Sequence, residues 1–165
     1  PSMLGLASGI VAGLVAITPA AGFAGPMGAI VLGLIVSPVC LLFCAAIKNA
    51  LKYDDSLDAF GIHAIGGIIG AIGTGIVVDP ALGGAGIVDF STCDAATATC
   101  GALEYNMASQ VSFQAMGVGL TVVWSAVASF IVWYAVKLLT GGRVKQEVEE
   151  EGLDINEHGE VAYHS

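Results

Sequence analysis

Four long runs of apolar residues, separated by shorter polar segments, dominate the pattern of this chain. They cover about residues 3–18, 27–47, 59–78 and 107–139. The first run is slightly short of the roughly 20 residues that a helix needs to cross a bilayer, whereas the second has no charged residue at all. The pattern predicts an all-α membrane protein with four transmembrane helices in residues 1–143.

Prolines and lysines mark the places where these helices are expected to bend or end. Pro19 follows Thr18 and is expected to disturb the first helix, and Pro38 is expected to kink the second. Lys48 and Lys52 are expected to end the second helix. The fourth run is long enough for roughly 50 Å of helix, so we expect it to tilt strongly or to extend into water.

Two polar segments follow the third and fourth runs. Residues 79–106 have the composition of a loop, with four acidic residues, no Lys or Arg, and the cysteines Cys93 and Cys100. These cysteines either form a disulfide on an oxidising side of the membrane or remain free thiols. Zinc binding is not expected, because no histidine lies near them. Residues 144–165 form an acidic tail of the kind that is usually solvated, although residues 152–160 have a sequence that suits local folding.

The composition agrees with a membrane protein. Hydrophobic residues make up 56% of the chain and charged residues only 12%, and the mean hydropathy is +0.84. A soluble domain has about twice that charged fraction. The 23 glycines suit close packing of transmembrane helices. The net charge of −9 argues against nucleic-acid binding, which needs a basic surface.

The positions of the basic residues predict an orientation in the membrane. If every run crosses once, all five lie on one side: Lys48, Lys52, Lys137, Arg143 and Lys145. By the positive-inside rule, the turn before the third run and the tail are then cytoplasmic, and the 79–106 loop is extracellular. The chain has no recognisable signal peptide. Because it opens within an apolar pattern, we expect it to be the C-terminal piece of a longer protein.

His63 is the only ionisable residue between Asp58 and Asp79. An ionisable side chain inside a membrane segment is a functional-site hypothesis by default. Three interpretations stay open from the residues alone. The imidazole either forms a structural hydrogen bond with a neighbouring helix, relays protons or contacts substrate in a pore, or binds haem or a metal. For the last of these, the chain offers no second ligand at a suitable depth.

The surroundings of His63 in the sequence do not decide between these interpretations. By helical spacing, Phe60, Gly67, Gly70 and Thr74 share the face of His63. The small residues leave space beside the imidazole, as in a narrow channel, but they also suit plain helix packing.

Short polar and sulfur-containing residues next to this run have simpler interpretations. Asp54, Asp55 and Ser56 are candidates to cap the N-terminus of the third helix. Cys40 and Cys44 are spaced four residues apart, and we expect them to pack as small buried apolar side chains.

Three motifs resemble the ammonium transporter (Amt/Mep/Rh) family, and specifically its Amt branch. They are AGLVAITPAAG at residues 12–22, DDSLDAFGIH at 54–63 and GLDINEHGE at 152–160. The resemblance covers essentially the whole chain. It implies that the four helices are the last four of an eleven-helix bundle with inverted repeats, and that the protein is a transporter without a cofactor rather than an enzyme.

The resemblance also implies a mechanism and a set of site residues. Family members are homotrimers in which each protomer has a narrow hydrophobic pore with a pair of histidines, and His63 matches the second one. Ammonium loses its proton near the outer mouth, ammonia crosses the pore, and the proton follows by way of the histidine pair. Ser8, Val11 and Ala59 match positions near the pore or its inner vestibule, and Asp58 matches an acidic position at the inner end.

Partners and alternatives follow from the same resemblance. The tail is similar to a cytoplasmic segment that contacts a PII signalling protein in many members of the family. Alternative functions are an ammonium sensor that signals through this tail and a membrane subunit that anchors haem.

By helical rise, His63 would lie only about 6 Å past Ala59. A position midway through the membrane therefore requires Asp58 to lie at membrane depth, in a water-filled vestibule.

Overall fold

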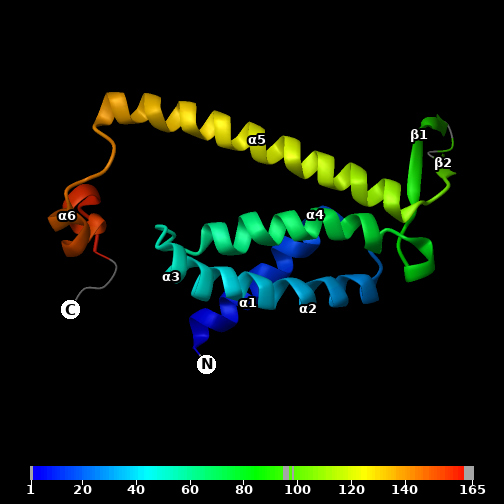
Figure 1. The fold of residues 1–165 in the computed structure, drawn as a ribbon, viewed down its shortest axis with the longest axis horizontal. Helices are drawn as coiled ribbons and strands as arrows, with labels where there is room; N and C mark the ends of the chain where they lie inside the picture. The colour runs from blue at the N-terminus through cyan, green and yellow to red at the C-terminus, as the bar shows by residue number, and fades with distance from the viewer. Residues whose placement is uncertain (1, 95–96, 98, 162–165) are drawn as a thin grey trace. The chain divides into compact units, whose positions relative to one another are not determined.

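The computed structural model describes residues 2–94, 97 and 99–161, and the chain divides into two compact units, residues 1–120 and 121–165. The first unit is built from helices and one β-hairpin (Figure 1). In chain order its elements are α1 (Met3–Ile17), η1 (Thr18–Ala20), α2 (Pro26–Leu42), η2 (Phe43–Ile47), α3 (Lys48–Leu51), η3 (Phe60–Ala64), α4 (Ile65–Val77), η4 (Pro80–Leu82), β1 (Ile87–Asp94), β2 (Thr99–Leu103) and the first part of α5 (Met107–Thr140).

Four helical stretches in the described part of the chain are long and apolar enough to cross a membrane. They are Met3–Ala20, Pro26–Leu51, Phe60–Val77 and Met107–Thr140, and they correspond to the four predicted runs. The first reaches 18 residues because the 3₁₀ turn η1 (Thr18–Ala20) continues the helix beyond Ile17, where α1 ends. The second reaches Leu51, and Lys52 ends it in the left-handed conformation, with φ at 55°.

The segment between α4 and α5 differs from the loop that the sequence pattern predicts. It contains an antiparallel hairpin in which Ile87 pairs with Leu103 and Asp94 with Thr99, and a disulfide joins Cys93 to Cys100 across it. The predicted all-α class is confirmed by the four long helices, and the hairpin is a small addition in the loop between two of them. Almost every position of both strands is exposed, so the strands bury no apolar face that would give an alternating pattern.

Helices α1, α2 and α4 pack together around a small core. A carbonyl oxygen of Ala16 in α1 occupies the space that a Cβ on Gly70 of α4 would need, and a Cβ on Gly73 would lie 2.6 Å from Leu32 Cδ1. Glycine at these two positions is what lets α4 approach both neighbours closely. The core comprises Ala12, Ala16, Ala20, Leu32, Val36, Cys40, Ile62 and Val77.

The start of α5 is tied to the end of α4. The hydroxyl of Tyr105 donates a hydrogen bond of 2.7 Å to the carbonyl of Gly75. A Cβ on Gly75 would lie only 3.0 Å from the Cα of Val111, so the two backbones are in close contact. Burial and the nearby Asp79 carboxylate raise the pKa of Tyr105.

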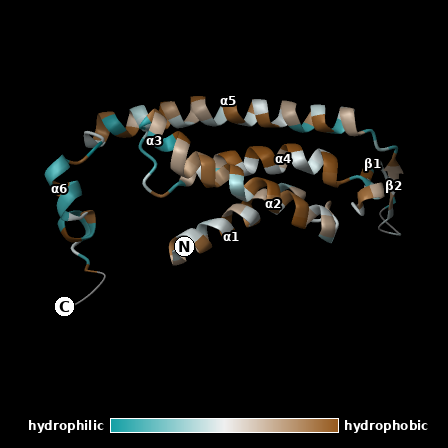
Figure 2. Cartoon of the chain, turned by 60° about the horizontal axis from the view of Figure 1, so that its bottom comes forward, coloured by the Kyte–Doolittle hydropathy of each residue, from teal (hydrophilic) through white to brown (hydrophobic). Residues whose placement is uncertain are grey.

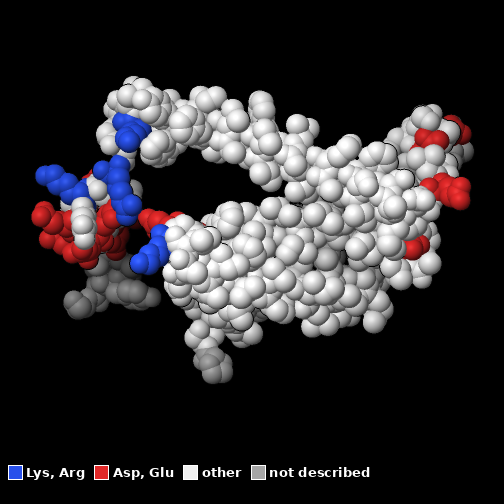
Figure 3. Space-filling model, viewed as in Figure 1, with Lys and Arg blue, Asp and Glu red and all other residues white. Residues whose placement is uncertain are grey.

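The outer surface of the first unit is apolar between two charged ends. Figure 2 shows hydrophobic residues over much of α1, α2 and α4. On the face shown in Figure 3, the body of this unit lacks charged side chains between the lysines of the α3 end and the acids of the hairpin end. Many large apolar side chains are exposed, such as Leu4 at 77% and Leu34 at 69%. Such a surface suits lipid or further transmembrane helices as its surroundings.

The second unit contains the rest of α5, then α6 (Gln146–Glu151) and the π turn η5 (Asp154–His158). Arg143 donates two hydrogen bonds, of 2.7 and 2.9 Å, to the carboxylate of Glu149. These hydrogen bonds lower the pKa of Glu149. Residues 152–160 fold locally, and the backbone amide of Glu160 donates a hydrogen bond of 2.8 Å to the carbonyl of Asp154.

Candidate functional site

Two π-helical turns, η2 and η3, contact each other where the second and third spans lie side by side. Cys44 of η2 sits directly against Gly61 of η3, where a Cβ would lie 2.5 Å from the cysteine sulfur. Single π turns inside α-helices are uncommon and occur often at functional sites. The sequence pattern did not predict either turn, and His63 lies in the second.

A second contact joins the two spans one residue further along. The thiol of Cys40 donates a long hydrogen bond, with sulfur and oxygen 3.8 Å apart, to the carbonyl of Ile62. Cys40 is 2% exposed and Ile62 is 6% exposed, so both belong to the core. The prediction that Cys40 is buried is confirmed, whereas Cys44 is only half-buried.

His63 is the next residue, and its side chain lies on an exposed side of the span. Among the described residues it has no hydrogen-bond partner. The structural hydrogen bond to a neighbouring helix, one of the three interpretations of His63, is therefore not seen among them. Gly70 and Thr74 share the face of His63 by spacing, yet both are buried, and Gly70 is covered by Ala16 of α1. Of the two alternatives left open by the sequence, plain helix packing therefore holds for Gly70 and Thr74. The π turn interrupts the α-helical register, and α1 covers only the later part of this face.

Helix α1, which contains Ser8 and Val11, contacts both η3 and α4. Val15 of α1 lies beside Gly66 of α4, and Ala16 lies beside Gly70, so the two helices run in the same direction. Val11 and Ala59 are exposed and Ser8 is half-buried.

Charged residues organise the start of the span that contains His63. The carboxylate of Asp55 accepts hydrogen bonds from the backbone amides of Phe60 and Gly61, at 3.0 and 3.2 Å. This confirms the predicted capping for one of its three candidates. Asp58 has a different role, because its carboxylate pairs with Lys48.

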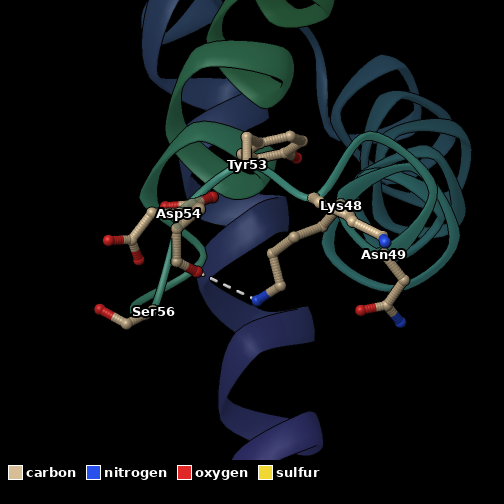
Figure 4. Close-up of a pocket in the computed structure, with 7 residues that line it drawn as sticks. Lys48, Asn49, Tyr53, Asp54 and Ser56 are labelled. Atoms are coloured by element: carbon tan, nitrogen blue, oxygen red, sulfur yellow. Dashed lines mark hydrogen bonds between the residues drawn. The ribbon is translucent and has the colours of Figure 1, made fainter.

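Next to this ion pair, the turn between α3 and η3 forms an open pocket of about 300 Å³ (Figure 4). Tyr53 is one of the residues that line it. Its hydroxyl donates a hydrogen bond of 3.2 Å to the carbonyl of Phe43, and its ring packs edge-on against the ring of Phe60, with the centroids 5.5 Å apart. Burial and the Asp55 carboxylate raise the pKa of Tyr53. The pocket is lined by Lys48, Asn49, Lys52, Tyr53, Asp54, Asp55 and Ser56.

The cysteine pair takes no part in this site. Cys93 and Cys100 lie in the hairpin after α4, at the opposite end of the first unit from α3 (Figure 1). Within residues 2–94, 97 and 99–161, no three His, Cys, Asp or Glu side chains gather as a metal site would need. What the site offers is an imidazole that has no hydrogen-bond partner among these described residues, on an apolar helix close to a charged end.

Comparison with known proteins identifies the family. The model of the Ammonium Transporter Family matches residues 1–163. The chain belongs to the ammonium transporter family. An ammonium transporter of Aquifex aeolicus is 43% identical over 163 residues, and one of Bacillus subtilis is 40% identical over 163 residues. Both alignments cover 99% of this chain.

The structural comparison agrees with this membership of the ammonium transporter family. The crystal structure of Saccharomyces cerevisiae Mep2 matches with a TM-score of 0.68 and 30% identity, over 88% of this chain and 31% of that one. The relatives are named transporters and not enzymes, and the apolar helices make this a membrane protein. The chain spans 35% of the Aquifex and 37% of the Bacillus relative.

Proposed function

We propose that this chain forms part of a pore that conducts ammonium or ammonia across the cell membrane, with His63 in the pore wall. The observation that carries the proposal is an imidazole on an exposed side of a span with no other ionisable residue, in a member of the ammonium transporter family. The part of the chain that the structure describes gives this imidazole no hydrogen-bond partner. An ionisable residue is costly inside a membrane, and it persists where a pore or a partner makes use of it.

The apolar surroundings of His63 give the pore a physical basis for selectivity. Moving a bare cation into a medium of low dielectric costs many kcal/mol, whereas the neutral ammonia molecule is far cheaper to transfer. An imidazole can accept and donate a proton near neutral pH. We therefore propose that His63 is the second of two pore histidines, and that its partner lies on a helix of the other structural repeat.

The remaining site residues have supporting roles in this proposal. We propose that Ser8, Val11 and Ala59 line the inner part of the pore, which their exposed or half-buried positions support. Asp58, held by Lys48, stands at its inner end. His63 is the fourth residue of the Phe60–Val77 stretch, so a position midway through the membrane still requires water to reach Asp58.

Orientation and assembly extend the proposal. In the first unit the basic residues of α3 and the acidic hairpin lie at opposite ends, which supports cytoplasmic placement of α3 by the positive-inside rule. The tail would then be cytoplasmic and available to a PII signalling protein. Because α5 has no buried residue in this chain, we propose that its apolar surface packs against further helices or lipid in a homotrimer.

An ammonium sensor is the alternative. The locally folded tail, with its Arg143–Glu149 pair, offers a segment that a signalling partner could read. Measured ammonium uptake distinguishes a sensor from a transporter, because a sensor that does not transport would leave uptake at the level of protein-free liposomes. Comparing uptake by the full-length protein and by its His63→Ala variant tests the pore role directly. Equal uptake by the two proteins would contradict it.

A further inference from the structure

We infer that Gly61, Cys44 and Cys40 are positioning residues that fix the direction of the His63 side chain. The inference rests on the proposed pore role of His63. These three residues do not contact substrate in our account. They hold the two backbone positions that come immediately before the histidine.

The first hold is a steric one. Gly61 is buried against Cys44, and an added Cβ would lie 2.5 Å from the sulfur and 3.2 Å from the backbone nitrogen of Cys44. Real Cβ atoms do not approach other atoms as closely as the first of these distances. Any side chain at residue 61 would therefore push η3 away from η2.

The second hold is a hydrogen bond in the core. Cys40 donates its thiol proton to the carbonyl of Ile62, while the Ile62 side chain is buried among the core residues. Two independent contacts therefore fix Ile62, one through its side chain and one through its carbonyl group. Its carbonyl belongs to the peptide plane that leads directly into His63.

These contacts determine where His63 can point. Gly61 and Ile62 are consecutive and both buried, which places the next residue on the outward side of the span. In the described chain the imidazole makes no hydrogen bond of its own that would orient it. Within this chain, the backbone of η3 therefore sets the direction in which the side chain leaves the helix. Two polarisable sulfur atoms on α2 and η2 hold that backbone from the side of the core.

The steric hold is tested in the full-length protein in proteoliposomes, with uptake normalised to the amount of folded protein. Gly61→Ala is expected to lower ammonium uptake by about tenfold, because sub-ångström to 1 Å displacements of a site residue carry penalties of this order or larger. Adding Cys44→Ala removes the sulfur that the new methyl group meets. The double variant should recover uptake to within about threefold of wild type, as expected for a coupled pair.

Matched variants separate positioning from a general packing defect. Gly33 of α2 has no atom within 4 Å of an added Cβ, so Gly33→Ala should leave uptake unchanged. Cys40→Ala removes the hydrogen bond to Ile62 and should reduce uptake, whereas Cys40→Ser keeps a donor at that position and should restore most of it. A Cys40→Ser variant as impaired as Cys40→Ala would overturn the role of the hydrogen bond.

A pH profile distinguishes the failure of this inference from the failure of the pore proposal. A merely structural defect lowers uptake by one factor at every pH, but a misdirected His63 changes the profile between about pH 5 and 8. If His63→Ala abolishes uptake while Gly61→Ala keeps both the wild-type rate and profile, the positioning inference is wrong and the pore role stands. If His63→Ala transports like wild type, the pore role itself is wrong.

Discussion

The ammonium group of Lys48 in α3 lies 2.5 Å from the carboxylate of Asp58, which stands in the turn just before the next span. The same nitrogen donates a hydrogen bond of 3.0 Å to the backbone carbonyl of Asp55. The side-chain carboxylate of Asp55 caps the helix that contains His63. Asp58 adopts a left-handed backbone conformation, with φ at 54°, that non-glycine residues rarely accept. Lys48 therefore stabilises a strained turn at the entry to the span that contains the candidate site.

This relationship predicts that breaking the pair loosens the turn. Lys48→Met should lower the midpoint of thermal unfolding of the full-length protein in detergent. Asp58→Asn should lower it as well, because Asn tolerates the left-handed conformation but loses the charge. The two side chains are each about a quarter to a third exposed, so solvent screening limits the effect. The double variant should be less destabilised than the sum of the single ones, and strict additivity would show that the pair contributes nothing.

Removing the hydroxyl of Tyr105 should weaken the junction between α4 and α5. Tyr105→Phe loses a 2.7 Å hydrogen bond and leaves the carbonyl of Gly75 without its tyrosine donor. We expect a loss of about 1 kcal/mol in the free energy of unfolding. Tyr134→Phe is the matched control, since Tyr134 is exposed and only its ring contacts Phe130. Equal stability of the two variants would contradict the role of Tyr105.

Reducing the disulfide should affect the hairpin and not the pore. The bond between Cys93 and Cys100 closes a short loop. By lowering the chain entropy of the unfolded state, it stabilises the hairpin by about 2 to 3 kcal/mol. Dithiothreitol, or the Cys93→Ser/Cys100→Ser variant, should speed proteolysis within residues 87–103. Ammonium uptake should stay within about twofold of wild type, because surface changes far from a site add little. Finding both thiols free by mass spectrometry of the untreated protein would contradict the bond.

The spans were predictable from the sequence because each one is an apolar run of sufficient length. The four predicted stretches match the observed helices to within a few residues, and the cap by Asp55 follows from its place before the third run. His63 could be singled out for the same reason, since no other ionisable residue interrupts that run. These features depend on local sequence alone.

The π turns could not be predicted, because they depend on contacts between distant segments. Gly61 meets Cys44 only after two spans pack side by side, and the resulting shift moves His63 relative to Gly70 and Thr74. The pairing of Asp58 with Lys48 likewise depends on the turn that folds back on the end of the second span. The hairpin was missed because its exposed strands lack an alternating pattern, and the disulfide that closes it was only one of two alternatives.

Ammonium uptake by the His63→Ala variant tests the central claim most directly. Wild-type and variant full-length proteins are reconstituted in proteoliposomes, and methylammonium uptake and ammonium-evoked currents are measured together, with protein-free liposomes as the baseline. The pore role predicts that the variant loses uptake or conducts with altered charge movement, because the imidazole that accepts and donates the proton is gone. Uptake and currents that both equal those of wild type would contradict the account.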